Sequence, residues 1–104
     1  MTAYHKLVRD KIPAIIESQG KKARIRILDE AEYGCALEEK LHEEVAEFQK
    51  DQNLEELADL LEVIFAAAEA RGYTKEQLES VRSEKEAQRG VFRKRLLLLE
   101  VSDS

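Results

Sequence analysis

Acidic side chains recur at helical spacing in the middle of the chain, where together they could hold a metal ion. Glu43, Glu44 and Glu47 are followed, after eight residues, by Glu56 and Asp59. Residues three or four positions apart lie on the same side of an α-helix, so each group would present its carboxylates together. Carboxylate oxygens are the ligands that a hard cation such as Mg²⁺ prefers, and Mn²⁺ could substitute for it. The spacing therefore predicts a divalent-metal site.

The first acidic group belongs to a helix that we expect to run from Asp29 to about Lys50. Asp29 and Glu32 have the spacing of a capping box at its start. On a helical wheel, one sector holds the apolar residues Leu37, Leu41, Val45 and Phe48. Glu44 falls at the edge of this sector, with Glu47 and then Glu43 slightly further round. Because an unpaired buried carboxylate is costly, the interior must contain a cation or a hydrogen-bond donor.

The second acidic group belongs to a helix expected from Asn53 to near Gly72. Its main apolar face is predicted to contain Leu54, Leu57, Leu61, Ile64, Phe65 and Ala68. Glu56 and Asp59 lie one turn apart on a second surface, which they share with Val63, Ala66 and Ala70. The five acids could converge if the two helices pack as antiparallel neighbours. Alternatively, Glu56 could simply close a capping box with Asn53.

Two more helices and two short strands complete the predicted fold. One helix follows Asp10 as its N-cap, tolerates Pro13 in its first turn and ends at Gly20, and another runs from Thr74 to just before Gly90. Residues 23–28 alternate in polarity and, with residues 91–101, could form a small antiparallel ribbon. We therefore predict an all-α fold: an antiparallel bundle of about four helices with a minor two-stranded ribbon, forming a single domain over residues 1–104.

Composition and charge exclude several classes of protein. The 104 residues carry a net charge of −5, and residues 29–86 contain eighteen acids against six bases. Such an acidic chain would repel a nucleic-acid backbone, so we expect no nucleic-acid partner. No apolar run is long enough to span a membrane, and no secretory signal is visible. With Cys35 as the single cysteine, these features favour a cytoplasmic location.

Two acidic motifs give the chain a family resemblance. Glu43-Glu44-Val45-Ala46-Glu47 and Glu56-Leu57-Ala58-Asp59 resemble the Glu-Glu-x-x-Glu and Glu-x-x-Asp signature of the all-α nucleoside triphosphate pyrophosphatases, the MazG and phosphoribosyl-ATP pyrophosphohydrolase superfamily. The segments Tyr4–Pro13 and Arg89–Phe92 resemble a small subgroup of that superfamily. The resemblance covers nearly the whole chain, although the eight residues between Glu47 and Glu56 are fewer than in many members.

The resemblance implies a homodimer or higher homo-oligomer that uses Mg²⁺ to cleave a canonical or noncanonical nucleoside triphosphate into a monophosphate and pyrophosphate. It assigns Glu44, Glu47, Glu56 and Asp59 as metal ligands, with Glu43 as the predicted general base. Phosphoribosyl-ATP is an alternative substrate. A non-catalytic acidic dimer or adaptor that pairs with a basic partner is the alternative from another functional class.

Basic residues near both ends of the chain could contact phosphate oxygens of a nucleotide. The candidates are Lys6, Arg9, Lys11, Lys85 and Arg89. They could equally balance neighbouring acids, or the helix dipole in the case of the last two. Aromatic residues could stack on a nucleotide base, although core packing is their default role, and these are Tyr4, Tyr33, Tyr73 and Phe92.

Overall fold

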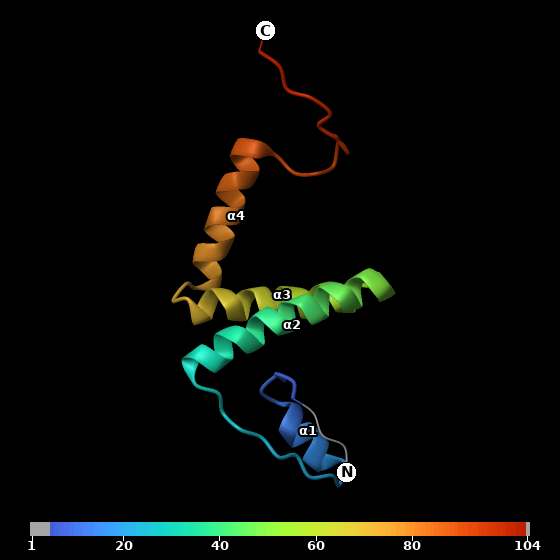
Figure 1. Cartoon of the computed structure of the whole chain (residues 1–104), viewed down its shortest axis with the longest axis vertical. Helices are drawn as coiled ribbons and strands as arrows, with labels where there is room; N and C mark the ends of the chain where they lie inside the picture. The colour runs from blue at the N-terminus through green and yellow to red at the C-terminus, as the bar shows by residue number, and fades with distance from the viewer. Residues whose placement is uncertain (1–4, 104) are drawn as a thin grey trace.

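The computed structural model describes residues 5–103, so Tyr4 lies outside the described residues. Within this described range, four helices follow one another: α1 (Ile12–Ser18), α2 (Glu30–Asp51), α3 (Leu54–Ala70) and α4 (Lys75–Arg89). No strand occurs within residues 5–103, and Figure 1 shows the helices joined by irregular segments. The predicted all-α fold is confirmed.

Side-chain caps begin α2 and α4 where the sequence indicated. The amide of Glu32 donates to Asp29 Oδ1 at 2.8 Å, and the amide of Asp29 donates back to Glu32 Oε1 at 3.3 Å. Thr74 and Gln77 form the same reciprocal pair at the start of α4. These interactions satisfy amide groups that the first turn of a helix leaves without backbone partners. The predicted starts of α2 and α4 are therefore confirmed.

The predicted N-cap of α1 is wrong. Lys11, not Asp10, precedes the first helical residue, and it makes no side-chain capping hydrogen bond. An Asp10 cap would need a free amide two or three residues further on. The amide of Ile12 is already bound to the carbonyl of Arg9 at 3.0 Å, and Pro13 has no amide hydrogen. The side chain of Asp10 consequently has no donor to cap.

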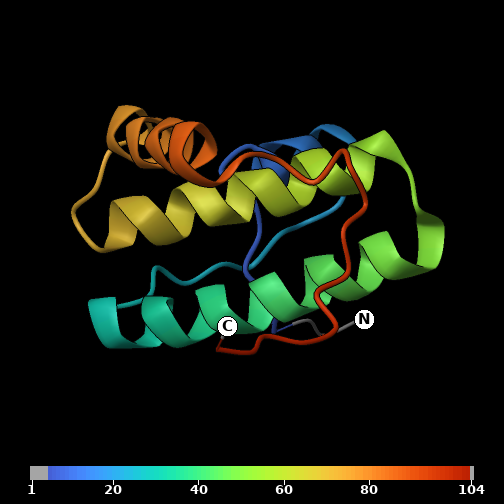
Figure 2. The ribbon, with the colours of Figure 1, turned by 90° about the horizontal axis from the view of Figure 1, so that it is seen from above.

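Helices α2 and α3 form an antiparallel hairpin, the most extensive helix packing in the described part of the chain. Figures 1 and 2 both show them side by side. The hairpin turns at Gln52, whose φ of 54° is left-handed and whose amide bonds the carbonyl of Phe48 at 2.8 Å. Of the residues that the structure describes, the buried apolar ones are Leu37 on α2 and Val63 on α3. The predicted antiparallel packing is confirmed for this pair.

The face of α3 that packs inward differs from the expected main face. Val63, on the surface shared with Glu56 and Asp59, is only 9% exposed. The expected main face remains open to solvent at four residues: Leu54, Leu57, Leu61 and Ile64. Periodicity shows which residues of a helix share a face, but the neighbouring helix decides which face it covers. Here α2 covers the face that carries the acids.

Helix α4 turns away from the hairpin instead of folding back along it (Figure 1). Gly72, with a φ of 86°, lies in the connection from α3. The ammonium group of Lys75 lies 4.8 Å from the centroid of the Phe65 ring and links the two helices there. Apart from Leu78 and Val81, α4 has few apolar residues to pack along α3. The antiparallel neighbour expected after Gly72 is therefore not formed.

The predicted β ribbon is also not formed within the chain. Residues 21–29 and 95–103 are irregular, and they lie towards opposite ends of the molecule in Figure 1. The principal extents are 67 × 31 × 21 Å, with a radius of gyration of 18.6 Å, whereas a compact domain of this length would have about 13 Å. Two strands separated along such a body cannot pair with each other. None of the helices in residues 5–103 has the combination of length and apolar composition that crossing a membrane requires.

Candidate metal centre

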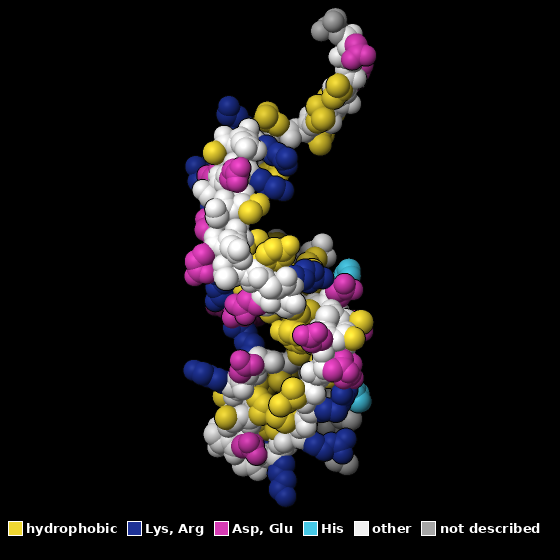
Figure 3. Space-filling model, turned by 90° about the vertical axis from the view of Figure 1, so that its left-hand side faces the viewer, with side chains coloured by type: hydrophobic (Ala, Val, Ile, Leu, Met, Phe, Trp, Pro, Cys, Tyr) yellow, Lys and Arg dark blue, Asp and Glu magenta, His cyan; other side chains and the backbone are white. Residues whose placement is uncertain are grey.

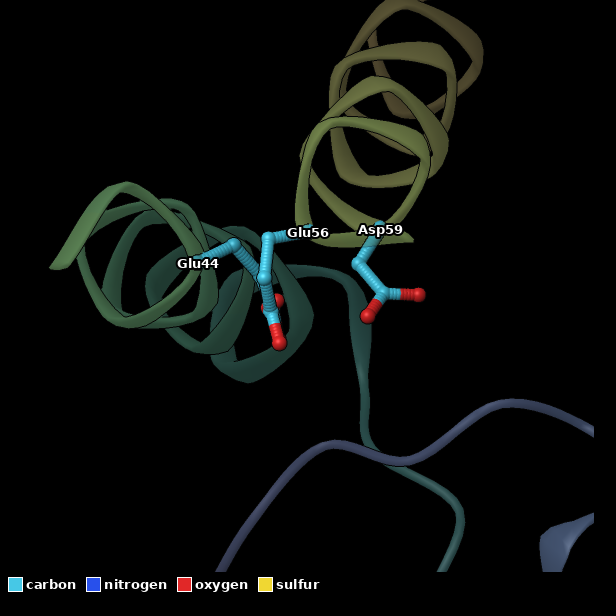
Figure 4. Close-up of side chains that lie close together, drawn as sticks. All are labelled: Glu44, Glu56 and Asp59. Atoms are coloured by element: carbon cyan, nitrogen blue, oxygen red, sulfur yellow. The ribbon is translucent and has the colours of Figure 1, made fainter. Parts of the chain in front are cut away.

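Two overlapping groups of carboxylates form where α2 and α3 pack together. Glu44, Glu56 and Asp59 can place one oxygen each within 4.8 Å of one another, and so can Glu47, Asp51 and Glu56. Glu56 belongs to both groups. Figure 4 shows the first group, with the three side chains projecting from two helices towards a common region. The structure thus brings together all four predicted metal ligands, Glu44, Glu47, Glu56 and Asp59, across the two groups.

The antiparallel hairpin explains how residues twelve or more positions apart meet. Glu44 lies at the α2–α3 interface and is only 8% exposed, as its place beside the apolar sector predicted. Asn53 Oδ1 accepts the amide of Glu56 at 2.9 Å. In the caps of α2 and α4 the side chain three residues on bonds back to the N-cap amide, but the cap of α3 lacks that return bond. The carboxylate of Glu56 is therefore free to join the acidic groups, so capping is only part of its role.

Asp51 is a member of the second group that sequence reasoning missed. It is the last residue of α2 and lies one turn after Glu47. The same spacing rule that singled out Glu43 and Glu47 would have included it. Because Asp51 lies at the end of the helix, next to the turn, its spacing from Glu47 was less apparent in the sequence.

Glu43 lies outside both carboxylate groups and faces cations. Lys6 Nζ lies 3.2 Å and Lys40 Nζ 3.5 Å from Glu43 Oε1. Partial burial tends to raise the pKa of Glu43, but the hydrogen bond from Lys6 and the charge of Lys40 outweigh it and leave the pKa below its ordinary value. Glu43 is thus held ionised beside the centre, and its role as general base stays a prediction.

Two basic residues, one from the start of the chain and one from α2, contact the acidic site. Arg9 Nη2 lies 2.6 Å from Asp59 Oδ1, and Lys40 Nζ lies 3.4 Å from Glu44 Oε1. In Figure 4 the three carboxylates point towards the side on which the N-terminal segment passes. Cations therefore compensate part of the acidic charge within the protein itself.

The other three predicted phosphate-binding residues do not join the carboxylates within one chain. Lys11 is exposed at the start of α1. Lys85 and Arg89 lie on α4, which leaves α3 from the end opposite to Glu56 and Asp59 (Figure 1). The helix rises about 16 Å over the eleven residue steps from Asp59 to Ala70. A phosphate role for these three residues stays a prediction.

Desolvation and the crowding of negative charge together raise the pKa of Glu56. Desolvation is the largest cause, followed by the charges of Asp59, Glu47, Asp51 and Glu44. A raised pKa in the folded state means that protonation favours folding. This contribution is complete below the ordinary pKa of a glutamate and is lost as pH rises through the raised value.

We therefore predict that the metal-free protein loses stability as pH rises from the ordinary pKa of a glutamate through the raised pKa of Glu56. We expect Glu56→Gln to reduce this loss. Melting temperatures in the presence of a chelator, measured across the range for both proteins, test this prediction. Glu55→Gln is the matched control, because Glu55 is exposed on α3 and belongs to neither group. Identical pH profiles for the wild type and Glu56→Gln would contradict it.

Comparison with known proteins gives one informative similarity and no functional description. The chain is 54% identical over 41 residues to an uncharacterized protein of Mycolicibacterium smegmatis (strain ATCC 700084 / mc(2)155). The matched part is 39% of this chain and 42% of that protein, so the chain spans less than half of the relative's length. No family model and no solved structure matches the chain.

Proposed function

We propose that this protein is a Mg²⁺-dependent nucleotide pyrophosphohydrolase, which converts a nucleoside triphosphate to a monophosphate and pyrophosphate. The observation that carries the proposal is the convergence of Glu44, Glu56 and Asp59 across the α2–α3 interface, within 4.8 Å of one another. These residues belong to the two motifs that resemble the all-α pyrophosphatases. Glu47 and Asp51 extend the same acidic region through Glu56.

The donor set fits Mg²⁺. Every candidate ligand in the two groups is a carboxylate, and the groups contain neither histidine nor cysteine, which disfavours softer metals. The ligands project from two packed helices, so little ordering is needed on binding. When bound, Mg²⁺ would neutralise phosphate charge and favour attack by water on phosphorus. Mn²⁺ should support the same reaction.

In the proposed reaction, the oxygen of a water molecule forms a bond to the α phosphorus. The bond between the α phosphorus and the oxygen that bridges the α and β phosphates breaks at the same time. The bridging oxygen leaves with pyrophosphate, and the attacking water loses a proton to a carboxylate. We assign that proton to Glu43, because it is an ionised carboxylate beside the centre and can accept it.

Arg9 and Lys6 have two roles in this proposal. In the protein without nucleotide they pair with Asp59 and Glu43. A nucleotide would offer phosphate oxygens to the same cations, and a guanidinium can bind two such oxygens at once. Arg9 would then move from Asp59 to phosphate and leave the Asp59 carboxylate free. The N-terminal segment thereby couples substrate binding to the availability of the metal ligand.

The same ion pairs favour a second candidate, a non-catalytic acidic adaptor. Because Lys6, Arg9 and Lys40 already compensate three acids, the acidic surface does not require a metal to be tolerated. This candidate predicts that divalent cations have no effect. Phosphoribosyl-ATP hydrolysis, the alternative within the enzyme class, would use the same carboxylates on a different nucleotide.

A substrate screen tests the proposal. Purified protein is incubated with the standard nucleoside triphosphates, with deaminated and oxidised ones, and with phosphoribosyl-ATP, and released pyrophosphate is measured with and without Mg²⁺. We expect release from at least one nucleotide, abolished by a chelator and restored by Mg²⁺ or Mn²⁺. No release from the whole panel, together with a melting temperature that millimolar Mg²⁺ leaves unchanged, would favour the adaptor instead.

Arg9→Ala is predicted to have opposite effects on the binding of Mg²⁺ and on the binding of the nucleotide. Without Arg9, Asp59 loses its competing cation, so Mg²⁺ alone should bind more tightly in a calorimetric titration. The nucleotide loses a charge-assisted contact, so its KM should rise about 10-fold or more. Lys21→Ala is the matched control, since Lys21 is an exposed cation outside the predicted phosphate contacts, and no ion pair of Lys21 occurs among residues 5–103. Weaker binding of both ligands would contradict the proposed role.

A further inference from the structure

Two segments with strand-like sequences lie open at opposite ends of the molecule. We call residues 23–28 the connecting segment, since they join α1 to α2, and residues 91–101 the C-terminal arm. Ile25 and Ile27 of the connecting segment are 63% and 90% exposed, and the leucines at 96–99 of the arm are 78–86% exposed. Figure 3 shows hydrophobic side chains at the surface along the arm and low on the body of the molecule. Contiguous apolar side chains of this kind indicate a surface that another chain covers.

Both segments also lack backbone partners. Across the described part of the chain, no backbone hydrogen bond involves residues 22–28 or 96–103. Unpaired amide and carbonyl groups along an apolar, extended segment are a template for pairing with another strand. Each segment therefore has a free strand edge with apolar side chains, with which the other segment could pair.

The total exposed surface of the chain is larger than that of a compact monomer of the same mass. The chain exposes 9996 Å², whereas a compact folded monomer of 11.9 kDa would expose about 5,900 Å². The difference of about 4,000 Å² exceeds the roughly 1,000–2,500 Å² that each copy hides in an obligate homodimer. A second chain of the same kind can therefore cover part of this excess surface.

The position of the two segments indicates how a second copy would bind. They lie towards opposite ends of the long axis (Figure 1), which measures 67 Å. The hairpin and α4 lie between them and hold them apart in one chain. A two-fold axis across the long axis would place the arm of each copy beside the connecting segment of the other and would make two identical contacts.

We propose that the C-terminal arm pairs as an antiparallel ribbon with residues 23–28 of a second copy of this chain, in a dimer held by two such exchanged arms. The period-two pattern of residues 23–28 agrees with a strand, and a partner strand in trans completes the ribbon that one chain cannot form. This assembly does not depend on the proposed catalytic activity, because neither segment contains a member of the carboxylate groups.

Cross-linking between two different variants tests the exchange directly. In a full-length Cys35→Ser background, which removes the single native thiol, one protein carries Ile25→Cys and another carries Leu98→Cys. The two are mixed and treated with a short bis-maleimide. We expect a product of twice the chain mass from the mixture, well above that from Ile25→Cys mixed with Ser83→Cys, a position exposed on α4.

Two outcomes of this experiment would overturn the proposal. One is a yield from the mixture no higher than from the α4 control. The other is efficient linkage within single chains that carry both new thiols, with no product of double mass at any dilution, because the ribbon would then form within one chain.

The mass in solution provides a second, independent measurement. Sedimentation of the wild type should give twice the chain mass. The full-length double variant Leu96→Asp/Leu98→Asp should weaken self-association at least about 100-fold, since two leucines that the proposed ribbon covers would become charged. Ser102→Asp adds a charge just beyond the arm and should leave the mass unchanged. Circular dichroism of the double variant should show the wild-type helix content. A wild type that stays monomeric at about 100 µM, or a double variant that associates as tightly as the wild type, would overturn the proposal.

Discussion

Asp59→Asn and Glu44→Gln are each expected to reduce pyrophosphate release at least about 100-fold, equivalent to ~2.7 kcal/mol of transition-state stabilisation. Each change replaces one negatively charged oxygen by an amide nitrogen in the group formed by Glu44, Glu56 and Asp59. An amide is a weak ligand for Mg²⁺ and cannot neutralise its charge. The measurement is the rate of pyrophosphate release at saturating Mg²⁺ with whichever nucleotide the substrate screen identifies.

The same variants should keep their helices. Asp59 pairs with Arg9 at a partly exposed position, and ion pairs near the surface contribute at most about 1 kcal/mol. Glu55→Gln and Glu62→Gln are the matched controls, because both residues are exposed on α3 and belong to neither carboxylate group. Wild-type turnover in Asp59→Asn or Glu44→Gln would remove that residue from the site. Equal losses in the controls would show that net charge, and not the site, determines the rate.

Leu37→Ala is expected to lower the free energy of unfolding by about 2–5 kcal/mol, the usual cost of truncating a buried leucine. Leu37 is 3% exposed and, among the described residues, shares the buried apolar core only with Val63. Because a domain is stable by only about 5–15 kcal/mol, this single change removes a large part of the total. The measurement is urea denaturation followed by circular dichroism at a fixed protein concentration.

Val81→Ala provides the comparison for Leu37→Ala. Val81 is 52% exposed on α4, so its truncation should change the free energy of unfolding by only about 0.5 kcal/mol. If the two substitutions cost the same, the α2–α3 interface would not be the main source of stability. The loss of Leu37 should also weaken the binding of Mg²⁺, since the same interface positions Glu44 opposite Glu56 and Asp59.

The sequence alone was sufficient to predict the helices and most members of the acidic groups. Asp29 with Glu32, and Thr74 with Gln77, begin helices where their spacing predicts. These interactions join residues three positions apart, so they do not depend on how distant parts of the chain pack. The apolar sector of α2 likewise placed Glu44 at a buried edge, as the structure confirms.

Only the tertiary structure decided how these elements meet. It placed the acidic side of α3 against α2, added Asp51 to the second carboxylate group, brought Arg9 to Asp59, and kept the two strand-like segments apart. The ion pairs of Lys6 and Arg9 join residues 37 and 50 positions apart. Side-chain patterns predict local structure because residues three or four positions apart are always neighbours on a helix. Contacts between residues far apart in the sequence depend on which faces of the helices pack against each other.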